Sequence, residues 1–295
     1  MTILSKGSTR LTLARPDVPE PYYRGTRFDR SGIILSLESG GHSFVSQWFL
    51  HYDPYMHDAV GGPAEEFTQV GYDSTDISGG FLKVGVGLLA RRSEDYDRFK
   101  LYDVLDEGTR SFRATEDTAE FRQILDAGGY GYDYVKTLAI PEDGVLRIGH
   151  SLRNTSSKPL DLYVYNHNFF VLDGAATGKD TVFRFPFKPD GHWRAEYDCV
   201  ALTDSGVGFS RDLEPGESVF MGDLRPDVPQ EKYNFLLSNR AKGLSVDVRS
   251  DAAMEYAVFW CNHEVACMEP YTRLHIGAGC TSEWYVEYRF LTCCH

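Results

Sequence analysis

Short apolar runs that alternate with polar residues recur along most of this chain, and they limit the folds it can adopt. Residues 146–154, LRIGHSLRN, show this period of two, which places neighbouring side chains on opposite faces of an extended strand. Turn sequences separate the runs, for example Glu142-Asp143-Gly144, Pro189-Asp190-Gly191 and Glu214-Pro215-Gly216. Strands joined by short polar turns are typical of β-sandwiches and barrels. The expected strands are 32–39, 134–141, 146–154, 160–172, 218–223, 244–250, 254–260 and 282–291.

Helical patterns are sparse. Residues 62–67, GPAEEF, could form one turn with Pro63 near its start. Residues 118–125, TAEFRQIL, are the best candidate for a short helix, although a strand fits them almost as well. No flexible linker or low-complexity stretch divides the chain. We therefore predict one all-β domain over 1–295, a large antiparallel β-sandwich with few short helices, in which 1–25 form an extension or an edge strand.

The charge and the cysteine content of the chain limit which partners and which cellular compartment we expect. The chain has 30 Lys and Arg against 43 Asp and Glu, a formal net charge of −13, so a nucleic acid partner is not expected. No apolar run reaches the roughly 18 residues of a membrane span, and the N-terminus lacks the apolar core of a signal peptide. We expect a cytoplasmic protein without a membrane partner. Cysteines are absent before Cys199 and none has CxxC spacing, which favours reduced, buried thiols; Cys293-Cys294-His295 carries little weight as a metal site.

The first candidate for chemistry is Asn166-His167-Asn168-Phe169-Phe170, at the end of a predicted strand. The flanking amides could orient the imidazole, and the aromatic rings could stack on a sugar. The alternative is a buried histidine that is hydrogen-bonded to the backbone.

The second candidate is Glu269, which follows four apolar residues, 265–268. A buried carboxylate is costly, so such a group is either paired or has a raised pKa that suits acid–base catalysis. The alternative is a strand-end glutamate that points to water.

These residues resemble segments of the aldose 1-epimerase (galactose mutarotase-like) superfamily. Trp260, then Cys267-Met268-Glu269-Pro270, then the closing strand pair at 274–290, LHIGAGCTSEWYVEYRF, are similar to its C-terminal third. Asn166-His167-Asn168-Phe169 resembles its N-H-x-Y/F-F segment.

Earlier segments extend the resemblance. Asn154-Thr155-Ser156 resembles the superfamily's element of a strand followed by N-x-S, 27–44 resemble its N-terminal strands, and 61–67, GGPAEEF, resemble its G-x-P-x-x-F element. The pieces keep the superfamily's order over roughly 27–290. The H-G-x-A-R and R-x-x-N-R segments of two branches are missing, and 80–85 read GFLKVG. The second histidine of galactose mutarotases therefore has no counterpart by motif, and the substrate stays open.

The resemblance implies a galactose mutarotase-like supersandwich and a reaction by proton transfer, without a cofactor or metal. It assigns the base to Glu269 and the acid to His167, with Asn166 or Asn168 orienting the imidazole ring or binding hydroxyls. The two catalytic groups should converge on one concave face about a pyranose width apart. We further predict that Trp48, Phe170 and Tyr271 stack on the sugar, and that His57, Glu66 and Lys83 contact it.

Two loops leave alternatives open. His51-Tyr52-Asp53 and His57-Asp58 could supply metal ligands, but the usual H-x-H pattern is absent, so a loop at the mouth of a sugar cleft is the better interpretation. Residues 91–98, RRSEDYDR, are expected to be a solvated connector, from which an arginine could bind a carboxylate or phosphate; Arg24, Arg27 and Arg153 are comparable candidates.

We therefore expect an aldose 1-epimerase-like isomerase that acts on a monosaccharide or sugar derivative. A carbohydrate-binding protein without catalysis and a sugar lyase or isomerase of the same fold remain alternatives, because a fold does not determine a function. The oligomeric state is not predicted.

Overall fold

The computed structural model describes residues 1–292, and this part of the chain contains strands and no helix. Cys293, Cys294 and His295 lie outside the described residues. The strands are β1 (Thr2–Lys6), β2 (Thr9–Leu13), β3 (Ile34–Ser39), β4 (His42–Val45), β5 (Ala64–Phe67), β6 (Gly80–Lys83), β7 (Gly87–Ala90), β8 (Val104–Asp106), β9 (Thr109–Ala114), β10 (Thr118–Ala127), β11 (Tyr130–Ala139), β12 (Val145–Asn154), β13 (Leu160–His167), β14 (Thr181–Arg184), β15 (Pro189–Trp193), β16 (Val200–Thr203), β17 (Gly206–Phe209), β18 (Ser218–Pro226), β19 (Asn234–Asn239), β20 (Leu244–Ser250), β21 (Tyr256–Asn262), β22 (Ala266–Ile276) and β23 (Thr281–Thr292).

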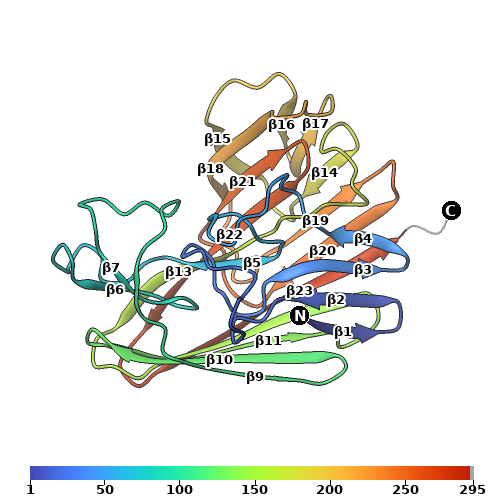
Figure 1. Ribbon diagram of the computed structural model, residues 1–295. Coiled ribbons are helices and arrows are strands. Elements are labelled where there is room, and N and C mark those ends of the chain that lie inside the picture. Colours follow the sequence, from blue (N-terminus) through green and yellow to red (C-terminus); the bar gives the residue numbers. More distant parts are fainter. Residues whose placement is uncertain (293–295) are drawn as a thin grey trace.

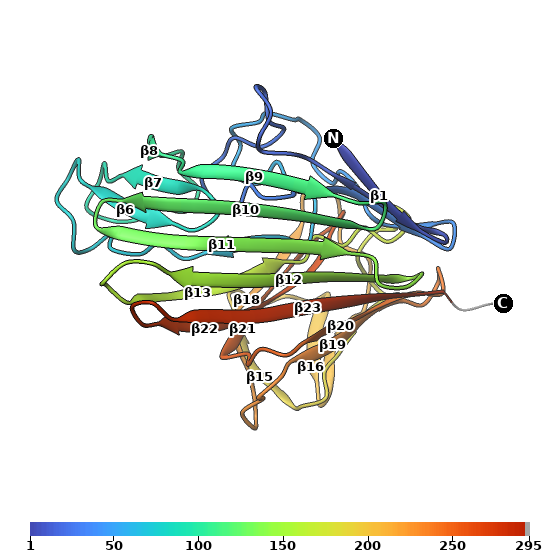
Figure 2. The same ribbon diagram turned by 90° about the horizontal axis from the view of Figure 1, so that it is seen from below.

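Two large antiparallel sheets dominate the molecule (Figure 1). The first has ten strands in the order β16-β17-β14-β19-β20-β23-β12-β11-β10-β9, and Figure 2 shows β9 to β12 and β23 side by side within it. The second has six strands in the order β15-β18-β21-β22-β13-β5. Two smaller sheets, β1-β2-β3-β4 and β6-β7-β8, complete the fold. The prediction of an all-β antiparallel sandwich is confirmed.

The main core lies where side chains of the two large sheets meet. Phe235 and Val246 of the ten-stranded sheet and Met221, Phe259 and Met268 of the six-stranded sheet belong to one buried apolar cluster. Strands β19, β20 and β21 alternate buried residues with more exposed ones, as expected when one face packs on the core. The opposite face of the six-stranded sheet is therefore free to carry other chemistry.

The helical interpretation of 62–67 and of 118–125 is wrong, and the strand alternative for 118–125 is confirmed. Residues 118–125 lie in β10, which pairs with both β9 and β11, and the AEEF sequence forms β5. A strand between two partners gains hydrogen bonds on both edges, and these tertiary contacts outweigh the weak helical pattern. The N-terminal segment contributes β1 and β2, with β1 at the edge of the four-stranded sheet.

The cysteines are free thiols, and most of those described are buried, as the sequence predicts. Cys199, Cys261 and Cys267 are buried free thiols, whereas Cys280 is an exposed one. Within the described chain, none of the elements is a helix with the length and apolar character that crossing a bilayer requires.

Candidate active site

The candidate site lies on the outer face of the six-stranded sheet, and strand pairing places its residues. On β13 and β22, Tyr165 lies opposite Tyr271. Two residues further along β13 is His167, and two residues back along β22 is Glu269, so both side chains share the face of this tyrosine pair. On β21, Val258 lies opposite Glu269 and extends the same face.

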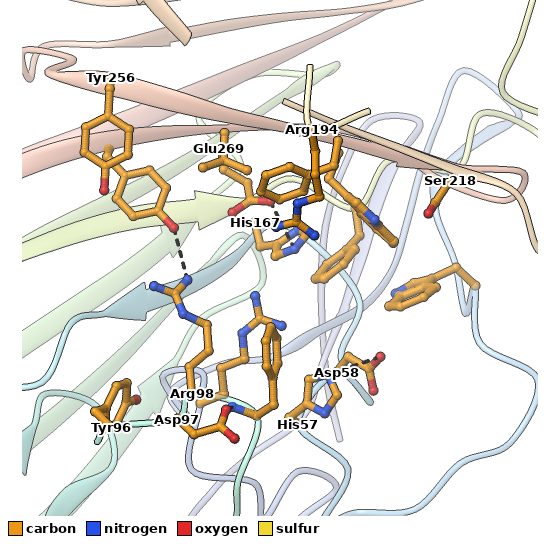
Figure 3. A pocket seen from close by; sticks show the side chains of 18 of the residues that line it. His57, Asp58, Tyr96, Asp97, Arg98, His167, Arg194, Ser218, Tyr256 and Glu269 are labelled. Atoms are coloured by element: carbon orange, nitrogen blue, oxygen red, sulfur yellow. Dashed lines mark hydrogen bonds and ion pairs between the residues drawn. The ribbon is translucent and has the colours of Figure 1, made fainter. Parts of the chain in front are cut away.

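A cavity of about 850 Å³ opens over this face (Figure 3). Strands β13, β18, β21 and β22 form its floor, and the loops at 46–63 and 91–103 contribute to its walls. The residues that line it are Arg27, Trp48, His57, Asp58, Tyr96, Asp97, Arg98, Phe99, His167, Phe169, Arg194, Tyr197, Ser218, Phe220, Tyr256, Val258, Trp260, Glu269 and Tyr271.

His167 and Glu269 form a close pair at the floor of this cavity. His167 Nε2 lies 3.3 Å from Glu269 Oε1, and the side chains keep only 6% and 5% of their surface exposed. The Cys267 thiol lies 3.1 Å from the other ring nitrogen, Nδ1, and the Phe169 ring stacks on the imidazole at 3.7 Å. The two groups converge as predicted but are in direct contact, which is much closer than a pyranose width.

Burial changes the protonation of both groups. It raises the pKa of Glu269 to about 8, an effect that Arg27 and Arg98 partly oppose. Burial, together with Arg27, lowers the pKa of His167 well below its usual range. At neutral pH the pair therefore holds one proton between two groups in contact, and it titrates as a unit.

The same pair fits a metal ion poorly. Ligand atoms of His167, Cys267 and Glu269 lie within 4.8 Å of one another. However, the thiol and the carboxylate contact opposite nitrogens of one imidazole ring, and a single ion cannot bind both nitrogens. Of the metal ligands proposed from sequence, His57 and Asp58 line the cavity. His51 is exposed, and the Asp53 carboxylate accepts a hydrogen bond from the backbone N–H of Tyr55.

A buried charged cluster lies beside the cavity, on the same face of the sheet as His167, because Glu66 of β5 lies opposite Tyr165 of β13. Glu66 Oε2 accepts a hydrogen bond from Arg27 Nε at 2.7 Å, and Glu66 Oε1 accepts one from Lys83 Nζ at 3.1 Å. Arg98 Nη1 lies 3.7 Å from Glu66 Oε2 and donates to the hydroxyls of Tyr165 and Tyr271, each at 3.2 Å. These cations, with a hydrogen bond from Tyr165, hold the pKa of Glu66 far below its usual range despite its burial.

Of the ten residues predicted to catalyse the reaction, orient the imidazole or contact the sugar, five line the cavity: His167, Glu269, His57, Trp48 and Tyr271.

Four others do not line the cavity. Asn166 donates to Glu65 at 2.8 Å and Asn168 donates to the Met268 carbonyl at 2.7 Å, because residues adjacent to His167 on a strand point to the opposite face. Glu66 and Lys83 have no exposed surface, since they pair with each other in the buried cluster beside the cavity. The predicted contacts of these four side chains with a sugar are therefore not supported.

Phe170 was predicted to stack on the sugar, but it belongs to the core between the sheets. Phe169, its neighbour, faces the cavity instead. Sequence reasoning also missed Arg194. The turn predicted at 189–191 is part of β15, and a bulge between Asp190 and His192 precedes Arg194 at the cavity wall. Arg27 and Arg98, which also line the cavity, are among the arginines that the sequence offers as candidates for binding an anion.

No family model matches the sequence, and no curated protein matches it significantly. Solved structures, in contrast, share the whole architecture, and the chain has the galactose mutarotase-like fold. A galactose mutarotase related enzyme from Lactobacillus acidophilus is 13% identical with a TM-score of 0.60, over 99% of this chain and 97% of that one. A galactose mutarotase-like protein from Lactobacillus casei is 12% identical with a TM-score of 0.56, over 99% and 100%. An aldose epimerase homologue from C. elegans is 12% identical with a TM-score of 0.56, over 99% and 98%.

Proposed function

We propose that this protein is an aldose 1-epimerase-like enzyme, which interconverts the anomers of a sugar by opening and reclosing its ring. The contact between His167 and Glu269 at the floor of an open cavity carries the proposal. Mutarotation needs one group that takes the proton of the anomeric hydroxyl and one that protonates the ring oxygen. A buried imidazole and carboxyl that share one proton meet that requirement.

The short separation fits this chemistry. The anomeric hydroxyl and the ring oxygen are bonded to the same carbon, so two catalytic groups side by side can reach both atoms from one direction. Because the pKa of Glu269 lies above that of His167, the shared proton rests on Glu269 and first moves to His167 across their contact. In the proposed reaction, the Glu269 carboxylate then removes the hydroxyl proton while the His167 imidazolium delivers the shared proton to the ring oxygen, and the ring opens to the aldehyde. Rotation about the first carbon–carbon bond and reclosure, with both proton transfers reversed, yield the other anomer.

The surroundings of the pair support this assignment. The Cys267 thiol contacts Nδ1 of His167, which leaves Nε2 for Glu269 or a substrate. Burial raises the pKa of the Cys267 thiol well above its usual range, so the thiol stays protonated and can donate to Nδ1. Trp260 is partly exposed and borders the cavity, so its ring can offer an apolar face to a sugar. The ring of Phe169 stacks between His167 and Trp48, and that of Tyr271 stacks between Tyr165 and Tyr256, so neither has a free face.

The direct test is anomer exchange by the purified protein. Polarimetry or proton NMR would follow equilibration of pure anomers of a panel of monosaccharides and acidic sugars, against the spontaneous rate. We expect acceleration for at least one of them. Binding of a sugar without acceleration would instead favour a carbohydrate-binding protein, and an ultraviolet-absorbing unsaturated product would favour a lyase.

The pH dependence follows from the shared proton. The pair holds one proton between the low pKa of His167 and the pKa of about 8 of Glu269. Above pH 8 the pair loses this proton, so kcat/KM should be flat near neutrality and then fall, about tenfold per pH unit in the limit. Exchange rates measured from pH 6 to 10, corrected for the spontaneous reaction, would check this. A rate that still rises through pH 9 would contradict the assignment.

A further inference from the structure

The buried cluster beside the candidate pair has an excess of positive charge. Arg27, Lys83 and Arg98 surround one carboxylate, that of Glu66. Burial lowers the pKa of Lys83 to about 8, so this amine is still mostly protonated at neutral pH. Glu66 and Lys83 are completely buried, and Arg27 is 7% exposed. Uncompensated charge in such surroundings is costly, and an anion bound at the open side of the cluster would offset it.

Arg98 is the member of the cluster that can reach such an anion. Its side chain is 32% exposed and lines the cavity, and Figure 3 shows it extending from the wall toward the floor. The hydroxyls of Tyr165 and Tyr271 hold Nη1, so the guanidinium is fixed in position before a ligand arrives. A planar guanidinium presents paired donors that match a carboxylate or a phosphate.

The position of Arg98 suits a ligand that also reaches the catalytic pair. Its partner Tyr271 lies two residues from Glu269 on the same face of β22, a spacing of about 7 Å along a strand. A pyranose with its anomeric carbon at His167 and Glu269 can span this distance with a charged group at the far side of its ring.

The remaining carboxylates of the cavity wall do not neutralise the positive charge of the cluster, because each has another partner. Asp97 accepts the backbone N–H of Phe99 at 3.0 Å and lies 4.0 Å from Lys100, and Asp58 lies 3.6 Å from His57. The chain as a whole carries a net charge of −13, so a cationic cluster in this cavity is not a result of composition.

We infer that the substrate is an anionic monosaccharide whose carboxylate or phosphate binds Arg98, above the charge supplied by Arg27 and Lys83. This inference rests on the proposed function for the position of the sugar ring, but it makes a separate statement about binding. The same anion site would accept a hexuronate or a hexose phosphate.

Isothermal titration calorimetry and exchange assays with D-glucuronate, D-glucose 6-phosphate and D-glucose test the inference. At least one of the two anionic sugars should bind tenfold or more tightly than glucose, and the better of the two identifies the anion. Arg98→Gln keeps a donor for the tyrosine hydroxyls but removes the charge. It should weaken binding of that sugar on the order of 10- to 100-fold and should change the KM for it more than kcat.

Arg92→Gln is the matched control, because Arg92 belongs to the same loop but is exposed and pairs with Asp103. It should bind the anionic sugars as the wild type does. Equal or tighter binding of glucose, or a loss in Arg194→Gln but not in Arg98→Gln, would overturn the inference. Anion-dependent binding without anomer exchange would refute the proposed function and leave the anion site in place.

Discussion

Glu269→Gln should lower the enzyme-catalysed rate of anomer exchange by about 10²- to 10⁴-fold, because the amide can neither accept nor deliver a proton at neutral pH. The substitution nearly preserves shape. It also replaces a carboxyl whose pKa burial raises to about 8, so the folded state loses no favourable ion and its thermal stability should be at least that of the wild type. Polarimetry with the best substrate, together with the melting temperature, would measure both effects.

His167→Asn should cause a loss of similar size. The double variant should be only slightly slower than either single variant, because two groups that share one proton act as a unit. Glu283→Gln, an exposed glutamate on β23, is the matched control and should retain wild-type exchange. Full activity in both Glu269→Gln and His167→Asn would refute the assignment of these residues.

Lys136→Met should destabilise the protein by about 3–5 kcal/mol. Lys136 is 1% exposed and pairs with Glu65, and it lies 3.6 Å from Asp29. Its Nζ also donates to the Ser31 carbonyl at 2.8 Å. Without the ammonium group two buried carboxyls lose their cation. Urea unfolding at pH 7 would show a lower midpoint.

The loss should shrink as the pH falls. Burial already raises the pKa of Glu65, so in the Lys136→Met variant this carboxyl takes up a proton at mildly acidic pH and its unpaired charge disappears. Arg122→Gln removes an exposed arginine that pairs with Asp133 on the neighbouring strand, and it should unfold at nearly the wild-type midpoint. Equal midpoints for Lys136→Met and the wild type would show that the buried network contributes no stability.

Much of the fold could be predicted from the sequence, because hydrophobic alternation is a local property. The stretch at 146–154 alternates and forms β12. The stretch at 118–125 was ambiguous, since its strand character depends on pairing with β9 and β11, which no local pattern shows. The Pro-Asp-Gly sequence at 189–191 predicts a turn but lies in a bulged edge strand, whose pairing with β18 no local pattern shows.

The candidate site was only partly predictable. His167 and Glu269 were found because each stands at an unusual place for a polar residue, the end or the interior of an apolar run. The alternation of side chains along a strand explains the wrong predictions for the residues next to His167. Asn166 and Asn168 were expected at the sugar, yet a period of two residues turns both away from it. Arg194 carries no local signal, because its position depends on how β15 pairs with β18.

Strand β5 carries two consecutive glutamates, and they serve different sides of the sheet. Glu66 pairs with Arg27 and Lys83 on the cavity side, whereas Glu65 pairs with Lys136 and Asn166 on the other side. A shift of β5 by a single position along β13 would exchange the positions of the two carboxylates. The cations on both sides of the sheet would then lose their partners. The two ion pairs thus fix the register of this edge strand. An insertion or deletion within Ala64–Phe67 should therefore be far less tolerated than one in the neighbouring loops.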